Sequence, residues 1–406
     1  MANRRDAGAA GSDLASAHIM LVVGEPSGDV LGAGLMRALK EMVPDVRLTG
    51  SGGNLMAAEG LQSVFPITDT SVMGPAAIIP RLPLIFRRIA EMTTHAKQTR
   101  PDLIVLIDSP DFTHRVAQRI RRALPEIPII DYVAPTVWAW RQGRAKAMAR
   151  YIDRVLALFP FEARFFRAVA GMPCSYVGHP AIERIPTAAQ GKAFRQQHAI
   201  AADTPLLAML PGSRENELHR LLPVFAHTLR NIAVQQKNLR VVLPTLPHLE
   251  AELRAATKDW SPPPIIVSDY AQRQGAFAAA TAALAASGTV SLELGLAGVP
   301  MVVAYRIDTI AGYVVGRMLR VPSIVLVNLV LDRPAIPEFL QREASPANLS
   351  EALIPLLSET SRRRRMLSDL EDFRIEMGVG GAAPSARAAK AVLDVLADRT
   401  APERSI

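Results

Sequence analysis

The sequence predicts an α/β protein with two domains, each built on a parallel sheet. Short apolar runs alternate with segments of helical period, which is typical of parallel strands joined by helices. The chain has 406 residues, more than the roughly 250–300 over which a single hydrophobic core usually grows. The alternating pattern also begins twice, at residues 19–24 and again at 206–213. We therefore expect two sheets that face each other across a cleft.

Each expected strand is a short run rich in Val, Ile, Leu or Ala, bounded by Gly, Pro, Asp or Ser. In the first half the runs cover 19–24, 47–53, 103–108 and 127–133, with helices expected near 30–42 and 112–124. In the second half they cover 206–213, 239–245, 264–269, 282–288 and 299–305, with helices expected near 217–236 and 273–280.

Composition shifts along the chain predict the domain boundaries. Residues 1–17 are small and polar and are expected to form a flexible tail, and a polar, turn-rich stretch follows residue 185. The first domain is thus expected at 18–185 and the second at 186–365. Residues 366–400 read as two C-terminal helices, with Ser385 as the N-cap of the second. These helices are expected to pack back on the first domain.

The charge balance favours an anionic partner. Lys and Arg number 46 against 38 Asp and Glu, which gives a net charge of +8. Such an excess suits nucleic acid, a phosphorylated substrate or an anionic membrane. The basic residues are scattered and accompanied by few aromatics, so nucleic acid is not expected.

The cysteine count and the start of the chain indicate a cytoplasmic protein. Cys174 is the only cysteine, so neither an intramolecular disulfide nor a zinc cluster is expected. The first 18 residues lack the apolar core of a signal peptide. The uncharged run 275–292 consists largely of Ala, Gly, Ser and Thr, and is expected to form a buried helix, strand and turn.

Ligands of parallel α/β sheets bind beyond the carboxyl ends of the strands, and four such places carry functional chemistry. The first is GEPSGDVLGAG, where Ser27, Gly28 and Asp29 precede a helix. Amides at a helix start favour anions or sugar hydroxyls. The glycine spacing differs from the GxGxxG dinucleotide fingerprint. The alternative is a tight turn with Asp29 as a helix cap.

The second place is PDLIVLIDSPDF, where Asp108 directly follows an apolar run and is expected to lie in the cleft. A carboxylate there suits a general base that removes a hydroxyl proton as the oxygen attacks. Asp111 is expected to cap the next helix. A structural role for a strand-terminal aspartate is the alternative.

The third place is LLAMLPGSRENE, where Gly212, Ser213 and Arg214 lie between a strand and a helix. Glycine lets the backbone approach a diphosphate, and arginine offers a bidentate fork to phosphate oxygens. The loop has no Walker-type lysine. A plain turn with a solvated arginine is the alternative.

The fourth place is LAASGTVSLELG, with Ser287, Gly288 and Thr289 at a turn and Glu293 one helical turn later. Small residues let a nucleotide lie against the backbone, and a carboxylate accepts hydrogen bonds from ribose hydroxyls. Ser and Thr at a helix start are also ordinary caps.

Nine segments together resemble the lipid-A-disaccharide synthase family in order and spacing over residues 18–395. They are GEPSGDVLGAGLMRALKE, SVMGP, PDLIVLIDSPDF, YVAPTVWAWRQGR, LALFPFEARFF, YVGHPAIE, LPGSRENEL, ASGTVSLELGLAGVPMVVAYR and VNLVLDRPAIPEFLQ. The resemblance implies a GT-B fold of two Rossmann-like domains and an inverting glycosyltransferase. It also implies a UDP-2,3-diacylglucosamine donor, an acylated glucosamine 1-phosphate acceptor, a β-1,6 linkage and no metal or other cofactor.

Carried over position by position, the resemblance makes Asp108 the base and Arg214 the essential phosphate-binding arginine. It places further UDP-side positions at Ser213, Ser287, Gly288, Thr289, Glu293, Asn328, Arg333 and Gln341. His179 either lines the cleft on the acceptor side or packs at the hinge.

Several residues depart from the family pattern. Asp131 and Ala134 stand in DYVAPTVWAWR, Val327 and Asp332 stand in LVNLVLDR, and the acidic residue usual soon after VMG is absent. We expect these changes to touch substrate-facing loops. The choice between glucosamine and a 2,3-diamino sugar, the acyl preference, and whether the protein is a homo-oligomer are left open. A UDP-sugar 2-epimerase is the nearest alternative enzyme.

The segment PAAIIPRLPLIFRRIA, within residues 75–90, combines apolar and basic side chains. The members expected to contact an anionic inner-membrane surface are Ile79, Arg81, Leu82, Leu84, Ile85, Phe86, Arg87 and Arg88. Three prolines argue against a long regular helix, so a short flap is expected, which would make the protein peripheral on the membrane. A core helix that begins after Pro83, with its arginines in water, is the alternative.

Overall fold

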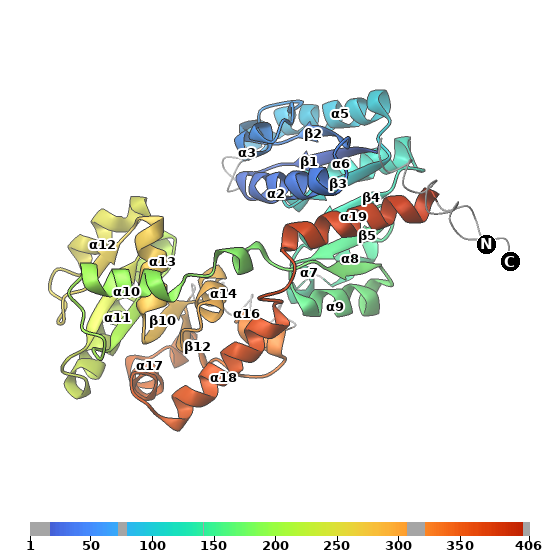
Figure 1. Cartoon of the computed structure of the whole chain (residues 1–406). Helices are drawn as coiled ribbons and strands as arrows, with labels where there is room; N and C mark the ends of the chain where they lie inside the picture. Colours follow the sequence, from blue (N-terminus) through green and yellow to red (C-terminus); the bar gives the residue numbers. More distant parts are fainter. Residues whose placement is uncertain (1–16, 72–78, 141, 307–320, 401–406) are drawn as a thin grey trace, which may run out of the picture. The chain divides into compact units, whose positions relative to one another are not determined.

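The computed structural model describes residues 17–71, 79–140, 142–306 and 321–400. The chain divides into two compact units (Figure 1). Unit 1 comprises Met1–Pro180 and Gly380–Ile406, and unit 2 comprises Ala181–Val379. Nearly all of the tail predicted at 1–17, and the start of the 75–90 segment, lie outside the described residues.

Unit 1 is built on a parallel sheet of six strands in the order β2-β1-β3-β4-β5-β6. Its strands are β1 His18–Val23, β2 Arg47–Ser51, β3 Leu103–Ile107, β4 Ile129–Tyr132, β5 Arg154–Ala157 and β6 Cys174–Tyr176. Its helices are α2 Pro26–Met42, α3 Asn54–Ala58, α5 Leu82–Thr99, α6 Pro110–Ala123, α7 Val137–Trp140, α8 Gly143–Met148, α9 Pro160–Ala170 and α19 Pro384–Thr400. All five strand pairings are parallel.

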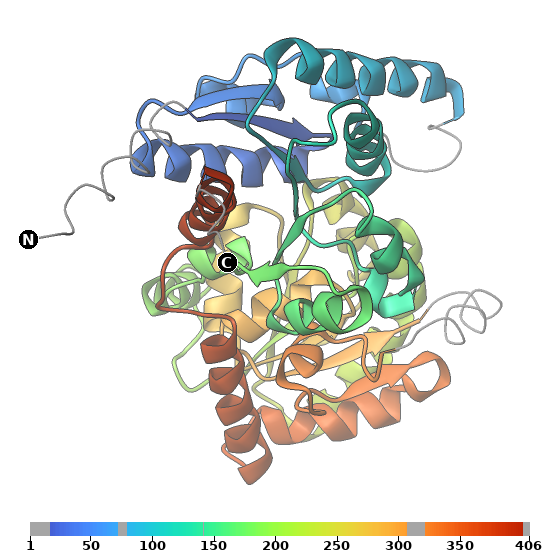
Figure 2. The same ribbon diagram turned by 90° about the vertical axis from the view of Figure 1, so that its right-hand side faces the viewer.

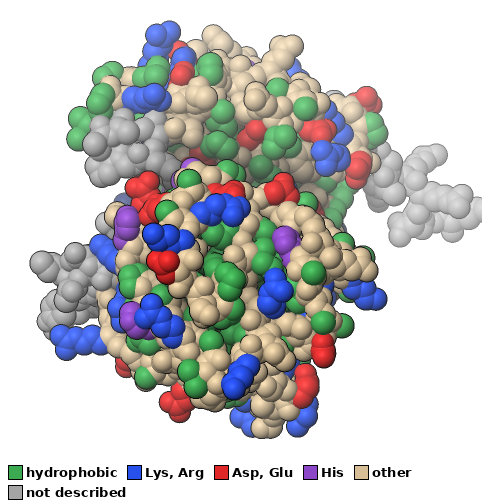
Figure 3. Space-filling model, turned by 90° about the vertical axis from the view of Figure 1, so that its left-hand side faces the viewer, with side chains coloured by type: hydrophobic (Ala, Val, Ile, Leu, Met, Phe, Trp, Pro, Cys, Tyr) green, Lys and Arg blue, Asp and Glu red, His purple; other side chains and the backbone are tan. Residues whose placement is uncertain are grey.

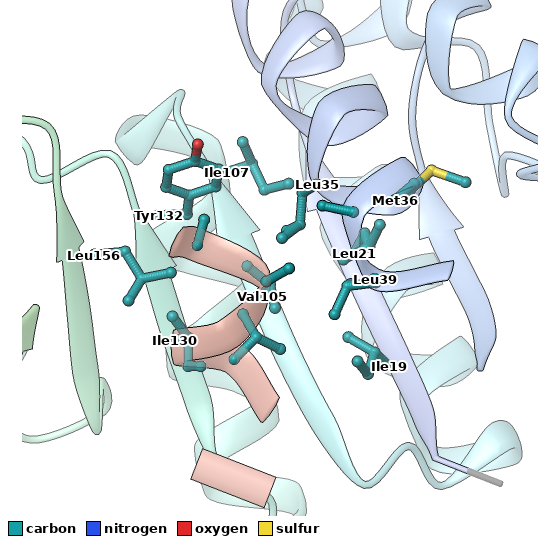
Figure 4. Close-up of a cluster of buried hydrophobic side chains, with 14 of the residues drawn as sticks. Ile19, Leu21, Leu35, Met36, Leu39, Val105, Ile107, Ile130, Tyr132 and Leu156 are labelled. Atoms are coloured by element: carbon teal, nitrogen blue, oxygen red, sulfur yellow. The ribbon is translucent and has the colours of Figure 1, made fainter. Parts of the chain in front are cut away.

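The two faces of this sheet carry separate cores. Ile19 and Leu21 of β1 point to the face covered by α2 and α19, whereas Met20 and Val22 point to the face covered by α5 and α6. Figure 4 shows the first of these clusters. Because strand side chains alternate between faces, a strand covered on both sides must be apolar throughout. This explains the uninterrupted apolar runs of the sequence.

Unit 2 repeats the architecture with the strand order β12-β11-β10-β7-β8-β9. The strands are β7 Leu206–Leu210, β8 Arg240–Pro244, β9 Ile265–Val267, β10 Ala282–Ala286, β11 Met301–Tyr305 and β12 Glu338–Leu340. The main helices are α10 Ala188–Gln197, α11 Glu215–Gln235, α12 Glu250–Ala256, α13 Tyr270–Ala279, α14 Thr289–Leu296, α16 Leu326–Leu331, α17 Pro346–Leu353 and α18 Ser361–Glu376. Run 275–292 therefore forms the expected buried helix, strand and turn.

Only one of the two C-terminal helices returns to unit 1. Helix α19 packs beside α2, with Ala388 and Val392 in the unit 1 core (Figure 2). Helix α18 stays with unit 2, so the prediction that it returns with α19 was wrong. Its buried Phe373 lies against Gly295 of α14, and the backbone N–H of Met301 lies 3.2 Å from the sulfur of Met366.

Two predicted caps were also wrong. Helix α19 begins at Pro384, so Ser385 lies inside its first turn and is not its N-cap. Helix α6 is capped at Ser109, and Asp111 lies in its first turn. An acidic side chain there still interacts favourably with the positive end of the helix dipole. No helix within the described ranges is both long enough and apolar enough to cross a bilayer.

Candidate functional site

In unit 1, the pairing of β1 with β3 brings two strand ends together. Val23 pairs with Ile107, so the residues after each strand emerge side by side. Glu25 follows β1 and Asp108 follows β3. Because both strands run in the same direction, their carboxyl ends meet at one edge of the sheet. The site therefore has two neighbouring carboxylates.

Asp108 is held by an unusual backbone. Its φ is 58° and that of Ser109 is 47°, both in the left-handed region. Non-glycine residues in this region cost on the order of 1 kcal/mol or more each, and persist where the surroundings enforce them. The N–H of Asp108 donates to the carbonyl of Tyr132 at 3.0 Å, and the hydroxyl of Thr113 donates to its carbonyl at 2.8 Å. These bonds fix the half-buried carboxylate at the strand end.

Glu25 was missed by the sequence reasoning, although it lies inside the first motif. Its pKa is raised, first by burial and second by the negative charge of Asp108. Hydrogen bonds from Ser27 and from the Ser109 amide oppose this rise. A raised pKa means that Glu25 holds a proton more readily than an exposed glutamate. The signal available in the sequence was a second carboxylate directly after a strand that neighbours the strand of Asp108.

Gly28 and Asp29 of the first motif have local structural roles. A Cβ on Gly28 would lie 2.9 Å from the carbonyl oxygen of Ile107, so glycine lets α2 approach the end of β3. The carboxylate of Asp29 accepts the amides of Gly53, Leu55 and Met56 at 2.8–3.1 Å. Asp29 is buried and caps α3, which corrects its assignment to the acceptor side.

His179 is a packed histidine. Its ring stacks on Phe159 with centroids 5.5 Å apart. Burial lowers its pKa to about 4, so it is neutral at neutral pH. Of the two readings of this residue, the structure favours packing.

Glu162 anchors the segment that contains Trp138. One carboxylate oxygen accepts the indole N–H of Trp138 at 3.0 Å. The other accepts the amides of Leu158 and Phe159 at 3.1 and 3.0 Å. Complete burial raises the pKa of Glu162 to about 7 despite these bonds. The loop after β4 therefore depends on a buried carboxyl group.

Two of the departures from the family pattern are internal. Asp131 is buried in β4 and lies 3.2 Å from Nε2 of His114. Val327 is fully buried beside Gly295. The expectation that these two positions touch substrate-facing loops was wrong.

In unit 2, a cavity of about 210 Å³ opens at the ends of β7, β8 and β10. It collects six of the predicted UDP-side residues, namely Gly212, Ser213, Ser287, Gly288, Thr289 and Glu293. Gly212 has φ 137° and Gly288 has φ 151°, which side-chain-bearing residues rarely adopt. Three separate loops thus converge on one pocket, two of them at the start of a helix.

Glu217 occupies the anion-binding donors of this pocket. Its carboxylate accepts the amide of Ser213 at 3.0 Å and pairs with Arg214 at 3.1 Å. The side chain of Arg214 is 75% exposed and lies next to the lining residue Ser213 without lining the cavity itself. The same donors are suited to phosphate oxygens.

Thr245 and Arg273 also line the pocket, and sequence reasoning missed both. The hydroxyl of Thr245 is buried and has no hydrogen-bond partner among the described residues, which suits a polar ligand. The pKa of Glu293 is raised by burial, and the positive charge of Arg273 opposes the rise. Arg273 lies on α13, outside the sequence motifs that contain the other predicted residues of the pocket.

Three predicted UDP-side residues do not line this pocket. The side chain of Asn328 is buried and bonded to the backbone N–H and carbonyl of Ile336 at 2.7 and 2.9 Å. Arg333 pairs with Asp369 and Asp372 of α18 at 2.8 and 2.6 Å. Gln341 lies in the short 3-10 helix Gln341–Glu343 after β12. The structure thus gives Asn328 and Arg333 structural roles.

The 79–90 segment combines features of the predicted membrane flap and of the alternative core helix. A long helix, α5, does form, because Pro83 lies in its first turn where the missing N–H costs nothing. Ile89 and Met92 face the core, whereas Ile79 and Phe86 are 66% and 47% exposed. Arg87 pairs with Glu91, and Arg88 is largely buried between Asp69 and Glu91. A role for Arg88 at lipid phosphates is therefore wrong.

Among the described residues, no three His, Cys, Asp or Glu side chains are grouped to hold a metal ion. On the face shown in Figure 3, Lys and Arg are interspersed with acidic and uncharged side chains.

Comparisons with known proteins agree on one family. The model of the lipid-A-disaccharide synthetase family matches residues 19–391. The lipid-A-disaccharide synthases of Rhodospirillum centenum and Nitrobacter hamburgensis are both 47% identical to the chain, over 387 and 389 residues. The alignments cover 95% and 96% of this chain, and 96% and 98% of those proteins.

Solved structures share the fold at low identity. UDP-GlcNAc 2-epimerase from Neisseria meningitidis, bound to UDP-GlcNAc, has a TM-score of 0.60 at 12% identity, and covers 94% of this chain and 100% of that one. MurG from Acinetobacter baumannii has a TM-score of 0.55 at 15% identity, and covers 94% and 99%.

We predict a pH-dependent contribution of Glu162 to stability. Its folded pKa of about 7 exceeds the ordinary 4.5. The folded state therefore binds more protons between these values, and the free energy of unfolding should fall as pH rises from about 4.5 to about 7. Urea unfolding should show that Glu162→Gln removes this fall, while the exposed control Glu41→Gln keeps it. Parallel pH curves for wild type and Glu162→Gln would contradict the assignment.

Proposed function

The chain belongs to the lipid-A-disaccharide synthase family, glycosyltransferases that act in lipid A biosynthesis, and on this basis we propose how its residues carry out the transfer. The donor is UDP-2,3-diacylglucosamine, and the acceptor is 2,3-diacylglucosamine 1-phosphate. The product is a β-1,6 disaccharide. The observation that carries the proposal is the strained, hydrogen-bonded Asp108 at the end of β3 in unit 1.

The donor's UDP binds in the unit 2 pocket. The Ser213 amide and Arg214 bind the diphosphate. Glu217 contacts both groups in this structure, so its carboxylate moves away when the diphosphate binds. Glu293 accepts hydrogen bonds from the ribose, and the unpartnered hydroxyl of Thr245 bonds the nucleotide. The similar epimerase holds a UDP-sugar in the same fold, which supports this choice of ligand.

The reaction is a single in-line displacement. Asp108 takes the proton of the acceptor's 6-hydroxyl while that oxygen forms a bond to the anomeric carbon. The bond from that carbon to the diphosphate oxygen breaks, and UDP leaves with the electron pair. Arg214 and the loop amides stabilise the charge that develops on the diphosphate. The proposed step uses no metal.

An anionic inner-membrane surface supplies the lipid substrates, and we place the protein at the cytoplasmic side of that membrane. The exposed Ile79 lies in the short 3-10 helix Ile79–Arg81 that precedes α5, and the exposed Leu82 and Phe86 lie at the start of α5 itself. Arg81 and Arg87 are close to them in sequence. Apolar side chains rimmed by arginines suit a peripheral contact with anionic lipid.

Asp108→Asn should keep the fold and lower turnover at least ~10²-fold, because an amide preserves the shape of the side chain and cannot accept the proton. Mass spectrometry of the product identifies the reaction, and a thermal unfolding scan checks the fold. Near-normal turnover at unchanged stability would remove Asp108 from the mechanism. An isomerised UDP-sugar in place of a disaccharide would instead identify a 2-epimerase.

Arg214→Ala should weaken UDP binding about tenfold or more and slow turnover, because it removes a charged donor from the diphosphate. Calorimetry with UDP measures the binding. Arg220→Ala is the matched control, since Arg220 is an exposed arginine on α11 outside the pocket. UDP affinity unchanged in Arg214→Ala would overturn this assignment.

Ile79→Ser/Phe86→Ser and Arg87→Glu should each reduce co-sedimentation with anionic vesicles, and added salt should weaken the binding of wild type. Val234→Ser/Ile375→Ser is the control, because both side chains are apolar and more than 60% exposed, on unit 2. Equal vesicle binding by all four proteins would refute the membrane surface.

A further inference from the structure

A second cavity, of about 400 Å³, lies beside Asp108 in unit 1. Helix α5 and the start of α6 give it a largely apolar wall, and the turns after β1 and β3 give it polar groups. Its lining residues are Glu25, Thr70, Leu82, Ile85, Phe86, Ser109, Pro110, Asp111, Phe112 and Arg115. The proposed mechanism uses Asp108, which precedes the lining residue Ser109, and gives no role to the residues that line this cavity.

Arg115 is the one basic residue among those that line the cavity. It lies one helical turn beyond Asp111 on α6, and its guanidinium stands 5.9 Å from the ring centroid of Phe86. This cation–π contact orients the side chain across the cavity wall. Across the described ranges Arg115 makes no ion pair, whereas Arg87 and Arg88 nearby are both paired with Glu91.

The charges around the cavity make such a cation necessary for any anionic ligand. Glu25 and Asp111 line it and Asp108 adjoins it, so an unassisted phosphate would be repelled. Among the described residues that line the cavity, Arg115 alone supplies positive charge.

The position of Arg115 along α6 keeps its side chain within reach of a sugar held at Asp108. Arg115 is six residues after Ser109, about 9 Å along the helix axis at 1.5 Å per residue. In a hexopyranose, carbon 1 and the carbon that bears the 6-hydroxymethyl group both flank the ring oxygen, so the 1-phosphate lies on the same side of the ring as the 6-hydroxyl group. A sugar whose 6-hydroxyl meets Asp108 therefore places its 1-phosphate in the adjoining cavity, where a long arginine side chain can reach it.

We propose that Arg115 binds the 1-phosphate of the acceptor, with an acyl chain of the same lipid against Leu82, Ile85 and Phe86. The inference rests on the proposed function and adds a residue that selects the phosphorylated acceptor. It is separate from Arg214, which serves the donor's diphosphate in unit 2. The guanidinium suits this task because its fork bonds two phosphate oxygens at once.

The test compares acceptors with and without the 1-phosphate. Arg115→Gln should raise KM for the phosphorylated acceptor about 10- to 100-fold, the loss expected for a charged hydrogen bond. Its kcat and its KM for the donor should change little, and its use of the unphosphorylated acceptor should equal that of wild type. Arg115→Lys should retain part of the preference. In an Asp108→Asn background, calorimetry with the two acceptors should show the same selectivity without turnover.

Arg119→Gln is the matched control, because Arg119 is exposed one turn further along α6 and lies outside the cavity. It should behave as wild type. Equal losses with both acceptors in Arg115→Gln, or the same loss in Arg119→Gln, would overturn the role of Arg115 while the proposed function stands. Failure of wild type to form a disaccharide from either acceptor would overturn the proposed function, and this inference with it.

Discussion

The parallel pairing of β1 with β3 is the interaction on which the unit 1 site depends. It sets Glu25 beside Asp108 and brings α2 and α6 to the same edge of the sheet. Gly28 keeps α2 close to β3, and Asp29 in turn fixes the start of α3. A one-residue slip in this register would turn every side chain of β1 to the opposite face. The apolar cores on both faces therefore also hold the position of the Asp108 carboxylate.

Hydrogen bonding distinguishes Asp29 and Asn328, which are buried and bonded within the fold, from Thr245, which lines the unit 2 pocket. Asp29 and Asn328 are buried with their polar atoms bonded to backbone groups, so they stabilise the fold locally. Thr245 is equally buried but unpartnered within the described residues, and it lines a pocket. Since burying an unpaired polar group costs free energy, such a group points to a ligand that the protein binds.

The sequence predicted the two-sheet α/β fold, because strands buried on both faces are apolar and their turns carry Gly, Pro and Asp. The four helices that it located by residue range lie within a few residues of the observed α2, α6, α11 and α13. It did not indicate β5, β6 or β12, which are only three or four residues long. Of the unit 2 pocket it predicted the lining residues that share a local motif, such as Ser213 and Glu293. It missed Arg273, which reaches the pocket from another helix, because only the folded chain brings such residues together. The family resemblance assigned Arg333 to UDP, whereas the structure pairs it with two aspartates of α18, and such an ion pair leaves no mark in local sequence.

The return of α19 to unit 1 affects the order in which the chain folds during synthesis. The helix that completes the α2 face comes from residues 384–400, after all of unit 2 has been made. Its contacts with α2 therefore join residues that are far apart in the sequence. The chain loses the conformational entropy of closing that long loop before these contacts can stabilise it. As the chain emerges from the ribosome, unit 2 can form as one continuous segment. The strands of unit 1 are translated first, but part of the core of unit 1 stays uncovered until α19 has been synthesised.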